Sequence, residues 1–364
     1  MPIVTATVST PTRHSFRVHQ VAGLFDLPLT PASQQTFQAE VPDLSADWNI
    51  GAIVGPSGSG KSTIAQAAFG AFLQASAGWS PTAAVIDELG VGSIKTITQT
   101  LTSVGFSSPP AWLRPYQALS NGERFRCDLA RALLSDQPLI VCDEFTSVVD
   151  RTVAQVGSAA VAKAIRSGRV AKRFVAVTCH YDVLPWLEAD WVLDMATGTL
   201  TRGRLRRPSI ELRVVRARQC AWAYFARHHY LSGELSRGAT CYVALWHDEP
   251  VAFCAVLGML GHRRHKRVTR LVTLPDYQGL GIGTRLLEYV CRRVRATGER
   301  ISITTSHPAM CAHLQSSTAW QLTSVRRRYQ PSRQQFRDVP VRDSHGRAVA
   351  SFEFVNTEPQ RNGL

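Results

Sequence analysis

Short runs of consecutive apolar residues organise the first half of the chain. Residues 49–54 form one run, which leads through a glycine-rich stretch into an alanine-rich segment at 64–73, and residues 139–142 form another that ends in two acidic residues. Buried parallel strands have continuous apolar sequences of this kind, whereas a longer alanine-rich segment favours a helix. The pattern predicts strands at 49–54 and 139–142, flanked by strands at 37–41 and 191–194, in an α/β fold.

A different pattern occupies the second half, where apolar runs rich in β-branched and aromatic residues are separated by turn-forming residues. The runs 240–245 and 250–256 flank the turn-like sequence His-Asp-Glu-Pro, which predicts a hairpin. A third run at 268–274 leads into a glycine-rich stretch and a helical pattern at 285–295, and a last strand is expected at 348–355. The second half is therefore predicted to be α+β.

Chain length and the change of pattern predict two domains with an extension. A length of 364 residues exceeds the size at which one core stops growing, about 250 to 300 residues. Residues 198–207 are expected to form a last turn and a basic linker. We expect domains at 1–205 and 206–333, a loop at 331–338, and a β-rich C-terminal extension at 334–364.

Cellular location is predicted from what the sequence does not contain. No run of about 20 apolar residues occurs, and the first thirty residues do not have the pattern of a secretory leader. The eight cysteines form no CxxC pair, so free thiols are expected rather than a disulfide framework or a zinc knuckle. We expect a cytoplasmic protein with no membrane partner.

The net charge of +14 is concentrated in the second half. Residues 1–200 contain 14 Lys and Arg against 16 Asp and Glu, and residues 201–364 contain 27 against 11. A domain that basic favours a polyanionic partner such as nucleic acid, because clustered cations attract phosphates and release their counterions. All but one of the 27 basic residues are Arg. A GC-rich genome produces the same bias, so both explanations remain open.

A phosphate-binding loop is predicted at 55–63. The sequence Gly-Pro-Ser-Gly-Ser-Gly-Lys-Ser-Thr follows a strand and precedes a helix, which is the context of a GxxxxGK[ST] loop. Glycines let the backbone wrap a phosphate, the lysine reaches the β and γ oxygens, and the serine hydroxyl can bind Mg²⁺. The predicted ATP-binding residues are Gly55, Ser57, Gly58, Gly60, Lys61, Ser62 and Thr63.

Two acids follow the apolar run at 139–142. Asp143 is expected to hold Mg²⁺ together with Ser62, and Glu144 is expected to polarise the water that attacks ATP. An apolar strand that ends in two acids is also common as a structural turn. Three further motifs favour the hydrolytic interpretation.

The sequence Leu-Ser-Asn-Gly-Glu at 119–123 resembles the LSGGQ signature of ABC ATPases. Residues 147–150 resemble the D-loop of that family, and residues 177–180 resemble the strand that carries its switch histidine. The resemblance implies that Ser120 and Gly122 contact ATP held by a second subunit of a homodimer, and that His180 contacts the γ-phosphate.

The chain also departs from the ABC pattern. Asn121 replaces a glycine and Glu123 replaces a glutamine of the signature. Only 56 residues separate Ser62 from Leu119, so the helical subdomain that docks on transporter membrane domains is reduced. No Q-loop glutamine can be assigned, although Asp87 and Glu88 lie near its expected position. A transport function is therefore disfavoured.

The spacing Gln278-x-x-Gly281-x-Gly283 resembles the pyrophosphate loop of GNAT acetyltransferases. A glycine-rich turn between strand and helix alone would also fit a dinucleotide site or a tight connection. The resemblance covers about residues 210–330. It implies that the amides at the helix start bind the CoA diphosphate and that the preceding strand pairs with pantetheine. The implied acyl-CoA residues are Leu271, Val272, Thr273, Gln278, Gly279, Gly281, Ile282, Gly283 and Thr284.

A narrower resemblance is to the Mom-type branch of GNAT proteins, phage enzymes that modify adenine in DNA. It is carried by residues 226–233, by Arg270-Leu271-Val272 and by Ser306-His307-Pro308. It implies that His229 and Tyr230 line the acceptor pocket, that Arg270 holds an anionic group, and that Ser306 or His307 transfers protons. The alternatives are that neighbouring histidines cap or pack a helix end and that the tyrosine belongs to a core.

Together these features predict an ABC-type P-loop ATPase domain followed by a GNAT domain. The hypothesis is transfer of an acyl group from acetyl-CoA or another acyl-CoA to an amine, with a nucleic-acid base as the favoured acceptor. A backbone amide in the 271–273 strand would stabilise the oxyanion. ATP with Mg²⁺ would regulate or remodel, because the thioester is already activated. The alternatives are a regulatory ATPase with a non-catalytic GNAT-like binding module and, with less support, a transporter ATPase subunit.

Overall fold

The computed structural model describes residues 2–74, 78–90, 92–229, 234–326 and 349–355, and the chain divides into two compact units. The first unit comprises residues 1–78, 136–148 and 164–207, and the second comprises residues 79–135, 149–163 and 208–364. The units are not linear segments, because two segments that precede residue 206 group with the C-terminal half. The predicted linear domain boundaries stay a prediction.

A five-stranded sheet forms the centre of the first unit. Its strand order is β4-β5-β3-β6-β7, with the first four parallel and β7 antiparallel to β6. The strands are β3 (Ile50–Val54), β4 (Leu139–Cys142), β5 (Arg173–Thr178), β6 (Trp191–Asp194) and β7 (Thr199–Arg202). Every residue of β3 is buried, as its continuous apolar sequence predicts. The strands expected at 49–54, 139–142 and 191–194 are confirmed.

The core of the first unit packs around Trp191 and helix α2 (Lys61–Phe69). Trp191 lies edge-on to Trp48, with ring centroids 5.5 Å apart, and contacts β3 at Gly51. A Cβ at Gly51 would lie 2.1 Å from the Trp191 ring, so only glycine lets this indole lie flat on the sheet. The remaining helices of this unit are α1 (Phe16–Leu24), α7 (Leu184–Leu187) and the last residues of α6 (Arg151–Arg166).

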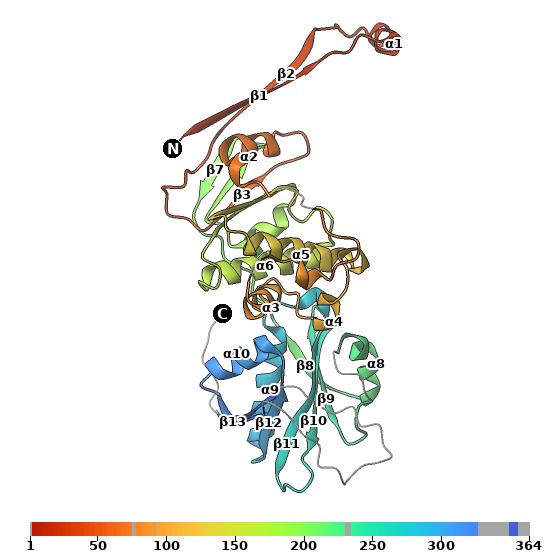
Figure 1. The fold of residues 1–364 in the computed structure, drawn as a ribbon, viewed down its shortest axis with the longest axis vertical. Helices are drawn as coiled ribbons and strands as arrows, with labels where there is room; N and C mark the ends of the chain where they lie inside the picture. The colour runs from red at the N-terminus through yellow and green to blue at the C-terminus, as the bar shows by residue number, and fades with distance from the viewer. Residues whose placement is uncertain (1, 75–77, 91, 230–233, 327–348, 356–364) are drawn as a thin grey trace. The chain divides into compact units, whose positions relative to one another are not determined.

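Strands β1 (Ile3–Pro11) and β2 (Ala32–Glu40) form a long antiparallel ribbon with α1 at its far end (Figure 1). The near end of the ribbon packs on the core through Val4, Ala6 and Phe37. The strand predicted at 37–41 is the last part of β2, and the earlier part of β2 is more exposed and polar.

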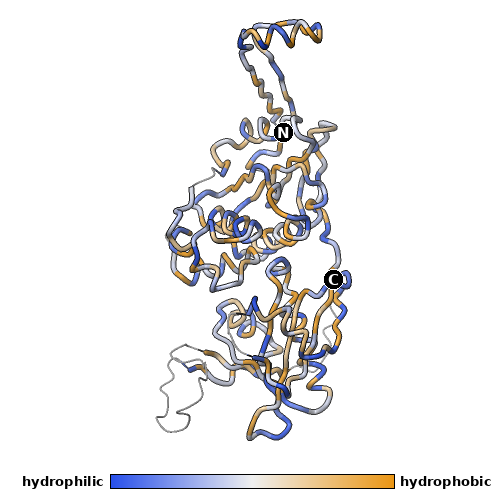
Figure 2. Tube along the Cα trace, turned by 90° about the vertical axis from the view of Figure 1, so that its right-hand side faces the viewer, coloured by the Kyte–Doolittle hydropathy of each residue, from blue (hydrophilic) through white to orange (hydrophobic). Residues whose placement is uncertain are grey.

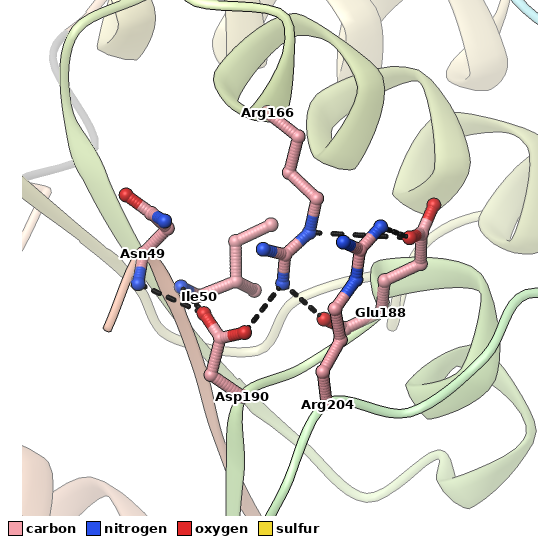
Figure 3. A network of polar contacts seen from close by, with 6 residues as sticks. All are labelled: Asn49, Ile50, Arg166, Glu188, Asp190 and Arg204. Atoms are coloured by element: carbon pink, nitrogen blue, oxygen red, sulfur yellow. Dashed lines mark hydrogen bonds and ion pairs between the residues drawn. The ribbon is translucent and has the colours of Figure 1, made fainter. Parts of the chain in front are cut away.

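A charged network holds the ends of β3 and β6 together (Figure 3). Asp190 accepts hydrogen bonds from the amides of Asn49 and Ile50 at 2.8 and 2.9 Å, and Arg166 donates to it at 2.8 Å. Glu188 pairs with Arg166 and Arg204. The amide and arginine hydrogen bonds outweigh the effect of burial and lower the pKa of Asp190, so the network contributes most when this carboxyl is ionised.

A seven-stranded sheet forms the centre of the second unit, with the order β13-β14-β12-β11-β10-β9-β8. All neighbours are antiparallel except β11 and β12, which are parallel. The strands are β8 (Arg213–Ala217), β9 (Thr240–Trp246), β10 (Glu249–Gly258), β11 (His265–Thr273), β12 (Arg300–Thr305), β13 (Trp320–Arg326) and β14 (Val349–Phe354). The central strands appear as long orange, hydrophobic stretches in Figure 2.

The predicted hairpin at 240–256 is confirmed as β9 and β10. His247 and Asp248 at its turn have φ values of 51° and 64°, the left-handed geometry that matches the twist of a two-residue hairpin. The last predicted strand is β14, and the expected loop at 331–338 lies outside the described residues. The predicted fold class, α/β followed by α+β, is confirmed.

Helices pack around this sheet and fill the N-terminal part of the second unit. Those near the sheet are α8 (Trp222–Phe225), α9 (Ile282–Ala296) and α10 (Pro308–Ser316). Those from earlier in the chain are α3 (Ile94–Ser103), α4 (Pro109–Trp112), α5 (Asn121–Leu134) and the first part of α6. All eight cysteines are free thiols. In the described part of the chain no helix has the length and hydropathy needed to cross a membrane.

Candidate functional sites

The loop between β3 and α2 has the backbone geometry of a phosphate cradle. Gly55, Gly58 and Gly60 have φ values of 150°, 79° and 85°, which residues with side chains rarely adopt. A Cβ at Gly60 would lie 2.2 Å from the ring of Phe37, so the start of α2 requires glycine. The first-turn amides of α2 have no acceptor within the helix and are available to an anion.

Two side chains in this loop fit a polyphosphate. Lys61 is buried and donates from Nζ to the carbonyl of Pro56 at 2.8 Å, which folds the ammonium back over the loop. Ser59 Oγ is buried and, among the residues that the structure describes, has no hydrogen-bond partner. A buried hydroxyl without a partner is unfavourable unless a ligand supplies one. The loop therefore suits a ligand with several acceptor oxygens.

Ser62 and Asp143 lie together at the carboxyl edge of the sheet. Ser62 Oγ donates to Asp143 Oδ1 at 3.0 Å, and the amide of Glu144 donates to the same oxygen at 2.9 Å. Hydroxyl and carboxylate oxygens are ligands that Mg²⁺ accepts, with phosphate and water completing its shell. Over the described ranges, no group of three or more His, Cys, Asp or Glu side chains could hold a metal ion.

Glu144 begins a strained turn after β4, and His180 follows β5 and contacts that turn. Glu144 and Thr146 have φ values of 51° and 70°, and backbone strain of this kind is concentrated at functional sites. Ser147 Oγ donates to Glu144 Oε2 at 2.9 Å, and Thr146 Oγ1 lies 3.1 Å from His180 Nδ1. His180 thus contacts the turn that Glu144 begins, and the action of both residues on the γ-phosphate stays a prediction.

The signature residues begin helix α5 in the second unit. Ser120 is the N-cap and accepts from the Glu123 amide at 3.3 Å, while Glu123 Oε2 accepts from the Ser120 amide at 2.9 Å. This reciprocal pair is a capping box, which explains how glutamate serves at position 123. Gly122 lies in the first turn of the same helix. The action of Ser120 and Gly122 across a dimer stays a prediction.

Glu88, near the position expected for a Q-loop residue, has structural contacts in the second unit. It accepts from the Ser80 amide at 3.0 Å and pairs with Arg131 at 3.3 Å. The Arg131 guanidinium in turn lies 3.4 Å from the centroid of the Trp79 ring, which stacks on Tyr116. These contacts hold the segment after residue 78 on α5.

The end of β11 is shaped by a bulge and by a separation from β12. Pairing with β10 skips Thr269, since Ala255 pairs with Arg270 and Val256 with Val268. Pairing with β12 ends at Val268, so the last five residues of β11 have no strand partner on that edge within the described ranges. Bulges of this kind re-aim a strand next to active sites. The edge of residues 271–273 is therefore not paired with β12, although the Thr273 carbonyl accepts a hydrogen bond from Gln278.

A second glycine-rich loop follows β11 and begins α9. Gly279 and Gly281 have φ values of 98° and 86°, and Gly281 is the N-cap. A Cβ at Gly283 would lie 2.6 Å from Thr273 Oγ1. The glycines thus allow the first turn of α9 to lie close against the end of β11, with its amides available to an anion.

The Gln278 side chain ties this loop to other parts of the second unit. Its Nε2 donates to the Thr273 carbonyl at 3.0 Å, and its Oε1 accepts from the Ser107 amide at 2.8 Å. Both polar ends are therefore used by protein groups, so any ligand at this loop is expected to meet its backbone. Leu271, Val272, Thr273, Ile282 and Thr284 follow their predicted places at the strand end and the helix start.

A candidate acceptor pocket lies beside Trp222. His229 packs edge-on against the Trp222 ring at 5.6 Å, and the guanidinium of Arg270 lies 5.7 Å from the same ring. Arg270 donates to the carbonyls of Thr269 and Glu234 at 2.9 and 3.2 Å. An open cavity of about 640 Å³ adjoins this cluster and is lined by Gln219, Cys220, Trp222, Ala223, Glu234 and Leu235.

The other predicted acceptor residues are not all brought to this pocket. Tyr230 lies outside the described residues. Ser306 follows β12, and His307 begins α10, where its Nε2 lies 3.4 Å from the Ser107 carbonyl. Burial lowers the pKa of His307, partly offset by that carbonyl, and burial with the neighbouring Arg227 lowers the pKa of His228. Both imidazoles thus favour the neutral form that can accept a proton.

Sequence reasoning missed the residues that meet the second loop from earlier in the chain. Ser107 and the buried Arg126 contact the loop at Gln278 and Asp276 respectively, with Arg126 Nη2 3.3 Å from the Asp276 carbonyl. Neither belongs to a motif for acyl-CoA. Because these contacts join residues 150 or more positions apart, no local sequence pattern predicts them. Trp222 and Glu234 were missed for a similar reason, because the pocket forms only when α8 folds over the sheet.

Comparison with known families gives a match within the second half of the chain. Residues 209–313 match the sequence profile of the acetyltransferase (GNAT) family. This segment contains β8 to β12, the glycine-rich loop and α9, so the site just described lies in a GNAT domain. No curated protein matches the chain.

Solved structures of two kinds are similar to parts of the chain. An IAA acetyltransferase from Bacillus cereus ATCC 14579 is 14% identical, with 40% of this chain and 99% of that chain covered and a TM-score of 0.29. A Bacillus subtilis acetyltransferase in complex with CoA is 13% identical over 40% and 98%, with a TM-score of 0.31. The ATP-binding cassette MJ0796, as a dimer bound to ADP and Pi, is 14% identical over 56% and 99%, with a TM-score of 0.39.

Proposed function

We propose that this protein binds ATP with Mg²⁺ and acyl-CoA and transfers the acyl group to an amine acceptor. The observation that carries the proposal is the end of β11, where a bulge, an unpaired strand edge and a glycine-rich helix start lie together inside a GNAT domain. A strand edge suits the extended amide-bearing arm of pantetheine, and the helix start suits a diphosphate.

The reaction needs positioning more than activation, because a thioester is already reactive. The acceptor nitrogen forms a bond with the acyl carbon, the bond from that carbon to sulfur breaks, and CoA leaves as a thiolate that takes up a proton. A backbone amide at 271–273 stabilises the oxyanion. Trp222 supplies an apolar wall and His229 lies against it, and we assign acceptance of the amine proton to His229.

The acceptor class that fits the charge is a nucleic-acid base. Arg263, Arg264 and Arg267 are exposed around the turn between β10 and β11, and the second half carries a large surplus of arginine. Lys266 and Arg300 are paired with Glu299 and Glu353 and contribute less. Exposed arginines at a strand turn bind phosphates and position the duplex or single strand without reading its sequence.

The phosphate loop serves regulation in this proposal. Lys61, Ser62 and Asp143 would hold ATP and Mg²⁺, and the metal would supply Lewis-acid stabilisation of the phosphates. Glu144 accepts a proton from water or orients it, and His180 lies within reach of the same edge. A homodimer that pairs the phosphate loop of one protomer with Ser120 of its partner would make this step depend on assembly.

The test is a transfer assay with the full chain, Mg²⁺, labelled acetyl-CoA and separate pools of DNA, tRNA and protein, with and without ATP. We expect label in a nucleic-acid pool, lost when Gly281 is replaced by Val. Gly258→Ala is the matched control, because a Cβ there meets nothing within 4 Å and its φ is not positive. No label in any pool together with intact ATP hydrolysis would refute acetyl transfer to these acceptors and favour a binding module.

A further inference from the structure

Two faces of the glycine-rich loop are packed against segments from the N-terminal part of the second unit. A Cβ at Gly279 would lie 3.0 Å from Ala160 Cβ and 3.1 Å from Gly105 Cα. A Cβ at Gly281 would lie 3.4 Å from Lys163 Nζ. Ala160 and Lys163 are three residues apart on α6 and therefore share one face of that helix.

This contact is closely packed and includes a buried hydrogen-bonded arginine. A Cβ at Gly105 would lie 2.5 Å from the Gln278 carbonyl oxygen, so glycine is required on both sides. Arg126 is 1% exposed and donates to the Asp276 carbonyl. Burial lowers its pKa, opposed by the charges of Asp276, Glu123 and Asp150, so a desolvated cation is kept at the base of the loop.

Lys163 differs from the rest of α6 in its exposure. It is the one exposed residue of that helix, which is otherwise buried or half-buried along its described length. Its ammonium is beside the N-cap glycine of α9, where unpaired amides already favour negative charge. A lysine is a flexible point charge that binds phosphate without fixed geometry, so it can follow a diphosphate on the loop.

We propose that Lys163 binds the diphosphate of acyl-CoA, so that a helix from the ATPase part of the sequence completes the acyl-donor site. The inference rests on the proposed function, since it names a further binding residue for the same donor. With this role for Lys163, the GNAT fold alone does not give full affinity for acyl-CoA. It also gives the phosphate-binding half of the sequence a direct part in the transfer step.

The test is calorimetric binding of CoA to the full chain and to Lys163→Ala, Lys163→Arg and Lys163→Glu. Loss of a charge-assisted contact predicts a dissociation constant for CoA at least tenfold larger in Lys163→Ala. The loss of affinity should be larger in Lys163→Glu, and Lys163→Arg should keep nearly all of the wild-type affinity. The loss should shrink at high salt. Lys95→Ala, an exposed lysine on α3 of the same unit, is the matched control and should leave the constant unchanged.

Two further arms separate the ways in which the inference can fail. 3′-Dephospho-CoA should show the same loss on Lys163→Ala, and a loss that disappears with this probe would overturn the diphosphate assignment. ATP binding should be equal in all five proteins, which shows that the phosphate loop of the first unit is intact, and equal near-UV circular dichroism shows that the second unit is folded. Wild-type affinity in Lys163→Ala would refute the role of this lysine alone, whereas no CoA binding by the wild-type chain would refute the proposed function.

Discussion

The close packing of Gly283 on Thr273 predicts that Gly283→Ala destabilises α9 in the wild-type chain but stabilises it in a variant with a smaller residue at 273. A Cβ at Gly283 would lie 2.6 Å from Thr273 Oγ1, and its next neighbour is Thr273 Cβ at 3.9 Å. Overpacking of this kind costs about 1–3 kcal/mol, while alanine in place of glycine inside a helix gains about 1 kcal/mol. Gly283→Ala should therefore destabilise α9 by roughly 0–2 kcal/mol. In a Thr273→Ala background the same change should stabilise it.

Hydrogen exchange of the α9 amides in the full chain measures this directly, because it reports the local free energy of opening without requiring the two units to unfold together. The four proteins of the double-mutant cycle should give a coupling energy of about 1–3 kcal/mol between positions 273 and 283. Acetyl-CoA should bind more weakly to Gly283→Ala than to the wild-type chain. The double variant should bind acetyl-CoA as tightly as Thr273→Ala does. A coupling below about 0.5 kcal/mol would contradict the packing argument.

Three further predictions concern the metal, pH and nucleic acid. Ser62→Ala and Asp143→Asn should weaken ATP binding about tenfold in Mg²⁺ and leave it unchanged in EDTA, measured by titration with a fluorescent ATP analogue. Because burial lowers the pKa of His307 in the folded chain, the unfolded chain binds the proton more tightly, so stability should fall as pH drops below about 6.5. In thermal melts, His307→Gln should therefore reduce the dependence of Tm on pH between about pH 7 and 5. Arg263→Ala with Arg264→Ala should reduce the salt slope of DNA binding by about 2; an unchanged slope would place the DNA elsewhere.

Local sequence was enough to predict the two glycine-rich loops and the strands before them. Each is a continuous strand, turn and helix start, so neighbouring residues determine the backbone. The hairpin of β9 and β10 was predictable for the same reason. The bulge at Thr269 was not, because only the pairing with β10 shows the skipped residue.

Side-chain roles depended on contacts that sequence does not show. Arg270 was expected to hold an anionic group, and in the structure it donates to two backbone carbonyls, which leaves that role a prediction. Glu123 appeared as a departure from the signature, and the capping box gives it a structural reason. The grouping of residues 79–135 and 149–163 with the C-terminal half is a long-range effect of buried packing.

The mutual contact of Gly105 and Gly279 constrains how this chain can evolve. A side chain at either position would meet backbone atoms of the opposite segment, so neither glycine can be replaced without separating the two segments. Homologues that keep this interface should therefore retain glycine at both positions. A chimaera that joined the first 200 residues to another acyltransferase domain would lose this contact wherever the new domain carried a side chain at the position of Gly279.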